Sequence, residues 1–307
     1  MQMLRLVNRH LSSSCGPLSI RLYTTSNKTV PLSFAKYSPS NGTSKDRNAS
    51  SIVVCHGLFG AKRNWRALCK AMSNQLRRDV YALDLRNHGD SPHSVPHTYE
   101  ALAEDVSQWI TEQGIEKPIL LGHSMGGKTV MTLALTKNDL VSKLIVVDIA
   151  PVHMTLLSEF PRYIQGMKLI ESKQLKRQTD VDQLMMEYEP ELHVRQFLLT
   201  NLKKSLDDGV YRFQVPVETL GNSLSNLAQF IQNHRYAGPT LFITGGASPY
   251  RKPFLAHPEL VDQQFPNNRI TVMPGCGHWL HAENPELFLS VVADFITTTE
   301  RLESEQH

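Results

Sequence analysis

The sequence predicts an α/β protein with a mostly parallel, doubly wound sheet and an inserted helical cap. Six short runs of aliphatic and β-branched residues recur along the chain, at 52–55, 80–84, 118–122, 144–148, 240–244 and 270–273. Segments with apolar residues at helical spacing, such as 102–110, lie between them. This alternation of strands and helices is typical of parallel sheets that helices cover on both faces.

The six runs are apolar almost throughout instead of alternating between apolar and polar residues. Strands of this kind are buried on both faces. Sheets built from them bind ligands beyond the carboxyl ends of the strands. We therefore expect the polar residues that follow the strands to gather at one crevice, and these include His56, Asp84, Ser124 and Asp148.

Residues 152–235 interrupt the alternation with several amphipathic stretches rich in Leu, Met and Tyr. Apolar residues at helical spacing usually pack against each other, so most of these should form the interior of a helical cap. A minority are expected to line an apolar pocket. The cap divides the α/β core into residues 24–151 and 236–307, and the polar stretch at 38–51 is expected to be a linker.

Residues 1–23 have the composition of a mitochondrial transit peptide. They are rich in Arg, Ser and Leu, and the first acidic residue of the chain is Asp46. The segment Arg21-Leu-Tyr23 resembles a matrix-protease cleavage site. We therefore expect the protein in the mitochondrial matrix.

The net charge of +3 does not point to a nucleic-acid partner. Arg5, Arg9 and Arg21 account for all of it, so the rest of the chain is close to neutral. Nucleic-acid-binding domains usually carry a clustered basic face. The sequence also has no apolar run near the ~20 residues that a transmembrane helix needs.

Metal, cofactor and disulfide chemistry are not predicted. The four cysteines form no CxxC pair, which argues against a disulfide framework or a thiolate metal site. His56 has no second ligand at metal-binding spacing nearby.

Gly122-His-Ser-Met-Gly126 matches the G-x-S-x-G pattern between a predicted strand and a predicted helix. In this nucleophile elbow a strained turn exposes the serine, and the residues two before and two after it must lack side chains. The context predicts an α/β-hydrolase fold with Ser124 as the nucleophile.

His56-Gly-Leu-Phe-Gly60 follows the first predicted parallel strand, where such hydrolases place half of the oxyanion hole. The backbone N–H groups of Leu58 and Met125 are therefore predicted to bind the developing oxyanion. Met125 also lies at a helix N-terminus, which favours negative charge.

His278 is predicted to be the general base. It lies in a glycine-flanked loop after the last strand, and an imidazole with its usual pKa can accept the serine proton at neutral pH. His281 is a competitor, but it lies next to a predicted helix start at Glu283, so a structural role is expected for it.

Two carboxylates compete for the third position. Many such hydrolases carry the acid after the strand at 240–244, but here the sequence continues Gly-Gly-Ala-Ser248 without a carboxylate. Asp148, at the end of the strand after the nucleophile helix, is the first candidate. Glu218, in the return segment of the cap, is the second. The chain order Ser, Asp, His is that of this fold.

Five segments together form a pattern more specific than G-x-S-x-G alone: 56–60, 84–92, 122–128 (GHSMGGK), 148–151 (DIAP) and 277–281. Through these segments the chain resembles the α/β-hydrolase domain-containing protein 11 family, and it is also similar to YbfF-type esterases and yeast ethanol acetyltransferases. The resemblance implies a mitochondrial serine esterase for acylglycerols or other acyl esters, in which the DIAP aspartate is the acid in some members. It also implies a tie to mitochondrial 2-oxo acid dehydrogenase complexes.

The predicted activity is hydrolysis of acyl esters through Ser124, His278 and Asp148. The same residues would serve thioester hydrolysis or acyl transfer to an alcohol. A non-catalytic partner of a mitochondrial enzyme complex is the alternative of another class. Inactive relatives usually lose the serine or the histidine, and both are present here.

Overall fold

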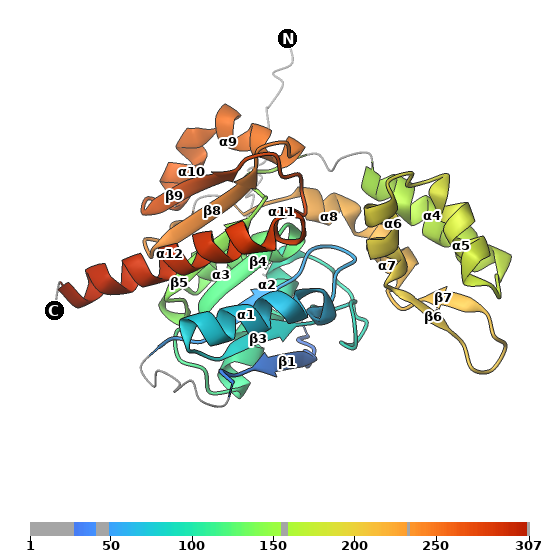
Figure 1. The fold of residues 1–307 in the computed structure, drawn as a ribbon, viewed down its shortest axis with the longest axis horizontal. Coiled ribbons are helices and arrows are strands. Elements are labelled where there is room, and N and C mark those ends of the chain that lie inside the picture. The colour runs from blue at the N-terminus through green and yellow to red at the C-terminus, as the bar shows by residue number, and fades with distance from the viewer. Residues whose placement is uncertain (1–27, 41–48, 155–158, 232–233, 306–307) are drawn as a thin grey trace, which may run out of the picture.

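A seven-stranded sheet runs through the centre of the molecule in the order β1-β3-β2-β4-β5-β8-β9 (Figure 1). The computed structural model describes residues 28–40, 49–154, 159–231 and 234–305. Only β1 is antiparallel to its neighbour within this sheet. The strands are β1 Phe34–Tyr37, β2 Ile52–Cys55, β3 Val80–Leu83, β4 Ile119–His123, β5 Lys143–Val147, β8 Thr240–Gly245 and β9 Asn268–Met273.

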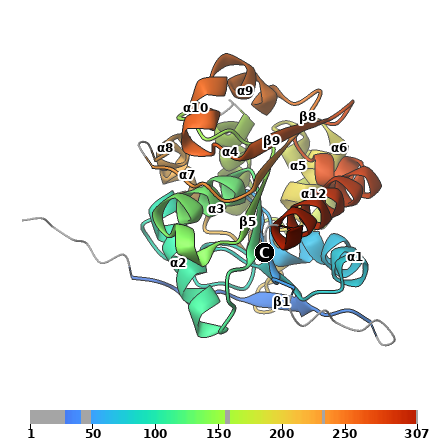
Figure 2. The same cartoon turned by 90° about the vertical axis from the view of Figure 1, so that its left-hand side faces the viewer.

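Helices cover both faces of the sheet, as Figure 2 shows in an edge view. Side chains of β2 alternate between two apolar clusters: Val53 and Cys55 pack with residues of α2 and α3, whereas Ile52 and Val54 pack with residues of α1 and α12. The predicted burial on both faces is therefore confirmed for β2. The core helices are α1 Arg66–Leu76, α2 Tyr99–Glu112, α3 Met125–Thr136, α9 Lys252–Ala256, α10 Pro258–Gln264, α11 Leu280–Glu283 and α12 Pro285–Glu305.

The six predicted strands are present with ends that differ by at most two residues from the predicted ends. The expectation of burial on both faces is wrong for β9, where Ile270 and Val272 are exposed because this strand forms an edge of the sheet. β1 is a further strand that the sequence patterns did not predict. Its side chains are alternately exposed and half-buried, so it lacks the apolar run that marks the other strands.

The cap consists of the elements from α4 to α8, which lie together at one side of the sheet (Figure 1). An antiparallel hairpin of β6 and β7 interrupts its helices, which the sequence analysis did not predict. Three-residue strands are too short to show an alternating pattern, and the turn between them uses Gly209 in the left-handed region, at φ 71°. The cap elements are α4 Glu159–Lys173, α5 Gln178–Met186, α6 Leu192–Leu199, β6 Leu202–Lys204, β7 Tyr211–Phe213, α7 Val217–Asn222 and α8 Leu224–Ala228.

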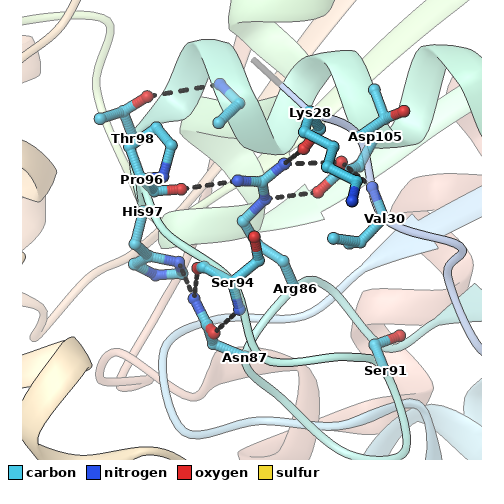
Figure 3. Close-up of polar contacts among 12 residues, drawn as sticks. Lys28, Val30, Arg86, Asn87, Ser91, Ser94, Pro96, His97, Thr98 and Asp105 are labelled. Carbon is cyan, nitrogen blue, oxygen red and sulfur yellow. Dashed lines mark hydrogen bonds and ion pairs between the residues drawn. The ribbon is translucent and has the colours of Figure 1, made fainter.

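A buried ion pair fixes the loop that follows β3 (Figure 3). Arg86 donates from Nε and Nη2 to the two carboxylate oxygens of Asp105 at 2.5 and 2.7 Å, and from Nη1 to the Pro96 carbonyl at 2.6 Å. Asn87 exchanges hydrogen bonds with the backbone of Ser94 at 2.8 and 2.9 Å. Paired and fully hydrogen-bonded charges of this kind tolerate burial and hold one geometry.

None of the helices in the described ranges combines the length and the apolar character that crossing a bilayer requires.

Candidate active site

Ser124 lies in a sharp turn between β4 and α3, with φ 52° and ψ −114°. The flanking glycines are required there. A Cβ on Gly122 would lie 2.3 Å from the Gly126 carbonyl oxygen, and a Cβ on Gly126 would lie 2.3 Å from the Cys55 carbonyl oxygen. The turn therefore holds the serine at the carboxyl end of the sheet in a backbone conformation that most residues avoid.

The side chains of Asp148 and His278 are in direct contact. Asp148 directly follows β5 and is fully buried, and its Oδ2 accepts a hydrogen bond from His278 Nδ1 at 2.8 Å. Because the carboxylate can only accept, Nδ1 carries the proton, and Nε2 of the neutral ring is left as an acceptor.

Two further contacts, one of the ring and one of the backbone, position His278. It stacks on Tyr250, with the ring centroids 4.2 Å apart. Its backbone carbonyl accepts a hydrogen bond from His123 Nε2 at 2.9 Å, next to the nucleophile turn. His278 and Ser124 line the same cavity. The structure therefore brings together the predicted nucleophile, base and acid.

Glu218, the second candidate for the acid, lies on the surface of the cap. Its side chain is 71% exposed and pairs with Lys168 at 2.6 Å. The Lys168 ammonium also lowers the pKa of this carboxyl. Asp148, not Glu218, is the carboxylate bound to His278.

Ser248 is a site residue that the sequence analysis missed. It lies just past β8, in the segment that departs from the common pattern of these hydrolases. Its hydroxyl donates to Asp148 Oδ2, and the Gly245 N–H donates to Oδ1 at 2.8 Å. Gly245, the last residue of β8, and Ser248 in the loop beyond it therefore both donate to the carboxylate that follows β5. The absence of a carboxylate from residues 245–248 was the sequence signal that could have pointed to Ser248.

Leu58 and Met125, the predicted oxyanion donors, both border a cavity that reaches Ser124. Within the described ranges, neither of their amides donates a hydrogen bond to another backbone group. The loop that carries Leu58 packs tightly on the elbow, because a Cβ on Gly57 would lie 3.3 Å from Ser124 Cβ.

His281 and Asp84, two further polar residues considered for the site, have structural roles. His281 stacks on Trp65, with the rings nearly parallel and 4.4 Å apart, and burial lowers its pKa to about 3. The structural role expected for His281 is thus supported. Asp84 was expected at the crevice, but it accepts hydrogen bonds from the backbone of Lys62 and Asp90 at 2.6 and 2.9 Å. Its carboxylate is therefore committed to holding a loop.

Two cavities meet at Ser124. The first is bordered by His278, by the loop after β2 and by aromatic and aliphatic side chains of the cap, among them Phe160, Tyr163 and Phe197. The second extends toward Tyr99, Leu227 and Lys128. Both are lined mainly by apolar side chains around the Ser124 hydroxyl.

Lys128 connects the nucleophile helix to the cap. Its buried ammonium donates to the carbonyls of Gln229 and Ala228 at 3.1 and 3.4 Å and lies over the ring of Tyr99. Burial lowers its pKa to about 7.

Known proteins resemble this chain over most of its length. A family model described as the alpha/beta hydrolase fold matches residues 50–285. A mouse (Mus musculus) protein named sn-1-specific diacylglycerol lipase ABHD11 is 38% identical over 88% of this chain and 86% of its own length. Esterase YbfF of Escherichia coli is 37% identical over 81% of this chain and 94% of its own length.

A solved structure of a marine microorganism esterase superimposes with a TM-score of 0.80 at 31% identity, covering 87% of this chain and 100% of that one. The chain therefore belongs to the α/β-hydrolase family, among its esterases and lipases, in the group that contains ABHD11 and YbfF.

Proposed function

We propose that this protein, a carboxylic ester hydrolase, cleaves acylglycerols or related lipid-type esters by a Ser-His-Asp acyl-enzyme mechanism. The observation that carries the proposal is the hydrogen bond between Asp148 and His278, in a site where His278 shares a cavity with Ser124. The apolar lining of both cavities favours an acyl substrate.

In the first half-reaction, Ser124 Oγ attacks the acyl carbonyl carbon while His278 Nε2 accepts the hydroxyl proton. The amides of Leu58 and Met125 bind the oxyanion of the tetrahedral intermediate. Asp148 stays ionised and stabilises the imidazolium. The intermediate collapses when the ester C–O bond breaks and His278 gives its proton to the leaving alcohol, which leaves the acyl group on Ser124.

In the second half-reaction, His278 takes a proton from water as the water oxygen attacks the acyl carbon. A second tetrahedral intermediate forms in the same oxyanion hole. Its collapse returns the proton to Ser124 Oγ and releases the carboxylic acid.

The substrate class rests on burial of apolar surface. Each methylene removed from water contributes ~0.8 kcal/mol, so cavities lined by Phe160, Phe197 and Leu227 should favour longer acyl chains. The mouse relative is named a diacylglycerol lipase, which supports acylglycerols as the natural class.

A chain-length series of p-nitrophenyl esters, from acetate to palmitate, tests this proposal on the wild-type protein. We expect kcat/KM to rise from acetate to medium-length chains by roughly tenfold or more, because the additional methylenes of the acyl chain are buried in the transition-state complex. Acylglycerols would then be compared by measuring fatty acid release.

Three outcomes would change the conclusion. No hydrolysis of any ester by folded protein would contradict ester cleavage. Hydrolysis restricted to acetate would contradict the lipid class. Formation of ethyl esters when ethanol is added would indicate acyl transfer, which uses the same residues.

No observation in the described ranges or in the comparisons supports an association with 2-oxo acid dehydrogenase complexes.

We also propose that residues 1–23, which lie outside the described residues, direct the protein to the mitochondrial matrix. The support is the Arg-rich composition without acidic residues. Full-length protein with a C-terminal fluorescent tag is expected in the matrix. A variant with Arg5, Arg9 and Arg21 replaced by Gln should stay in the cytosol. If both proteins have the same location, the proposal is wrong.

A further inference from the structure

The oxyanion loop, residues 56–60, contains a strained residue in a buried position. Phe59 has φ 62°, in the left-handed region, and its side chain is fully buried. A residue other than glycine keeps such a conformation only where its surroundings hold it. The contacts around Phe59 therefore determine the shape of the loop.

The core holds this loop through His88. The Phe59 N–H donates to His88 Nε2 at 3.2 Å, and His88 Nδ1 donates to the Arg86 carbonyl at 2.9 Å. Burial lowers the pKa of His88 well below its usual value, so the ring is neutral and has one donor and one acceptor nitrogen. Arg86 itself is anchored by its ion pair with Asp105 (Figure 3).

The cap holds the same residue from the other side. Asn201 follows α6 and is 1% exposed, and its Nδ2 donates to the Phe59 carbonyl at 2.8 Å and to the Leu198 carbonyl at 3.2 Å. The Asn201 backbone carbonyl accepts from the Gln214 N–H at 2.7 Å, at the base of the β6–β7 hairpin. Asn201 is therefore fixed in the cap and bound to the oxyanion loop.

A chain of hydrogen bonds leads from Asn201 to the predicted oxyanion donor. The Phe59 carbonyl and the Gly60 N–H belong to one peptide unit, and the Gly60 N–H donates to the Gly57 carbonyl at 2.9 Å. The Gly57 carbonyl and the Leu58 N–H belong to the next peptide unit in this chain. His56 Nδ1 also donates to the Gly57 carbonyl, at 2.8 Å.

From this chain we infer that Asn201 is a positioning residue for the oxyanion hole, an inference that rests on the proposed function. Planar peptide units transmit orientation, so the amide of Asn201 holds the Phe59–Gly60 unit, and that unit helps to hold the Gly57–Leu58 unit. Hydrogen bonds in series also polarise one another, which strengthens Leu58 N–H as a donor. The cap thus orders the catalytic loop as well as covering the substrate.

Gln214 provides a matched control in the same hairpin base. Its Nε2 donates to the Gly89 carbonyl at 2.6 Å, so it also joins the cap to a core loop. The Gly89 carbonyl is not part of the chain that leads to Leu58. Loss of this side chain should loosen the cap without changing the oxyanion loop.

The experiment compares Asn201→Leu and Asn201→Ala with Gln214→Ala and the wild type. We expect both Asn201 variants to lose about 10- to 100-fold in kcat on a p-nitrophenyl ester with little change in KM. This is less than the ~10²–10³-fold cost of removing an oxyanion donor outright, because the Leu58 amide remains. Gln214→Ala should stay within about threefold of the wild type.

A pair of inhibitors separates positioning from a structural role. A trifluoromethyl ketone adds to the serine and forms a tetrahedral oxyanion, whereas the matching methyl ketone binds without that charge. The Asn201 variants should lose affinity for the first by the same factor as kcat and retain affinity for the second. The ratio of the two affinities is a property of folded molecules, so a lower folded fraction does not obscure it.

The inference is wrong if the Asn201 variants keep the wild-type ratio of inhibitor affinities, or if Gln214→Ala lowers the ratio equally. Failure of the proposed function is a different result, because the wild type itself would then lack ester hydrolysis.

Discussion

Replacement of Ser124 by alanine is expected to abolish ester hydrolysis and labelling by a fluorophosphonate probe. The side-chain hydroxyl is the only group lost, and the proposed reaction forms its covalent intermediate on that oxygen. Removing the nucleophile of a catalytic triad lowers kcat by up to about 10⁶-fold, which leaves only the catalysis of the oxyanion hole and of substrate binding. The measurements are kcat on a p-nitrophenyl ester and fluorescence of the labelled band.

The variant should fold like the wild type, since the left-handed turn and the glycines that permit it are unchanged. Thermal unfolding of Ser124→Ala checks this. Heat-denatured wild type is the control for non-specific labelling, because a serine without its positioned base does not react quickly. Labelling of folded Ser124→Ala at the wild-type rate would place the nucleophile elsewhere.

Replacement of Asp148 by asparagine should lower kcat by roughly 10⁴-fold, the cost seen for the equivalent change in a serine protease triad. Asp148 accepts hydrogen bonds from His278, Ser248 and Gly245. The amide NH₂ of the Asp148→Asn variant can donate to Nδ1 of His278, which would favour the tautomer with the proton on Nε2. That nitrogen then cannot accept the proton of Ser124.

The matched control is Glu218→Gln, which also changes a carboxylate to an amide. Glu218 is exposed and pairs with Lys168 on the cap. The kcat of the Glu218→Gln variant should therefore stay within about twofold of the wild type. A surface pair of this kind contributes little to stability, and thermal unfolding should also change little. A large loss with Glu218→Gln and a small one with Asp148→Asn would reverse the assignment.

Sequence patterns predicted those parts of the fold whose environment is uniform along the element. Each buried parallel strand is surrounded by apolar side chains, so its own sequence is an apolar run. For β2, both predicted ends agree with the structure. The edge strand β1 and the two strands of the cap hairpin lack this signal. In β1, and in the short strands of the cap hairpin, each face meets solvent or a different neighbour, and the pattern is lost.

The nucleophile turn was predictable because its requirement is local: Gly122 and Gly126 must be small for contacts made within a few residues or with the adjacent strand. The partners of Asp148 are not local. His278 and Ser248 are 130 and 100 residues away from it in the chain. No spacing rule links them, and the sequence left Glu218 open as the acid.

The sequence by itself determined the class of sheet, the elbow that presents Ser124 and the histidine loop after the last strand, because each depends on contacts between near neighbours or on a repeated environment. Only the tertiary structure decided which carboxylate contacts His278, that Ser248 supports it, and that Asn201 of the cap binds the oxyanion loop. These depend on the packing of segments that the chain separates widely, where the free energy of a contact follows from geometry that composition does not encode.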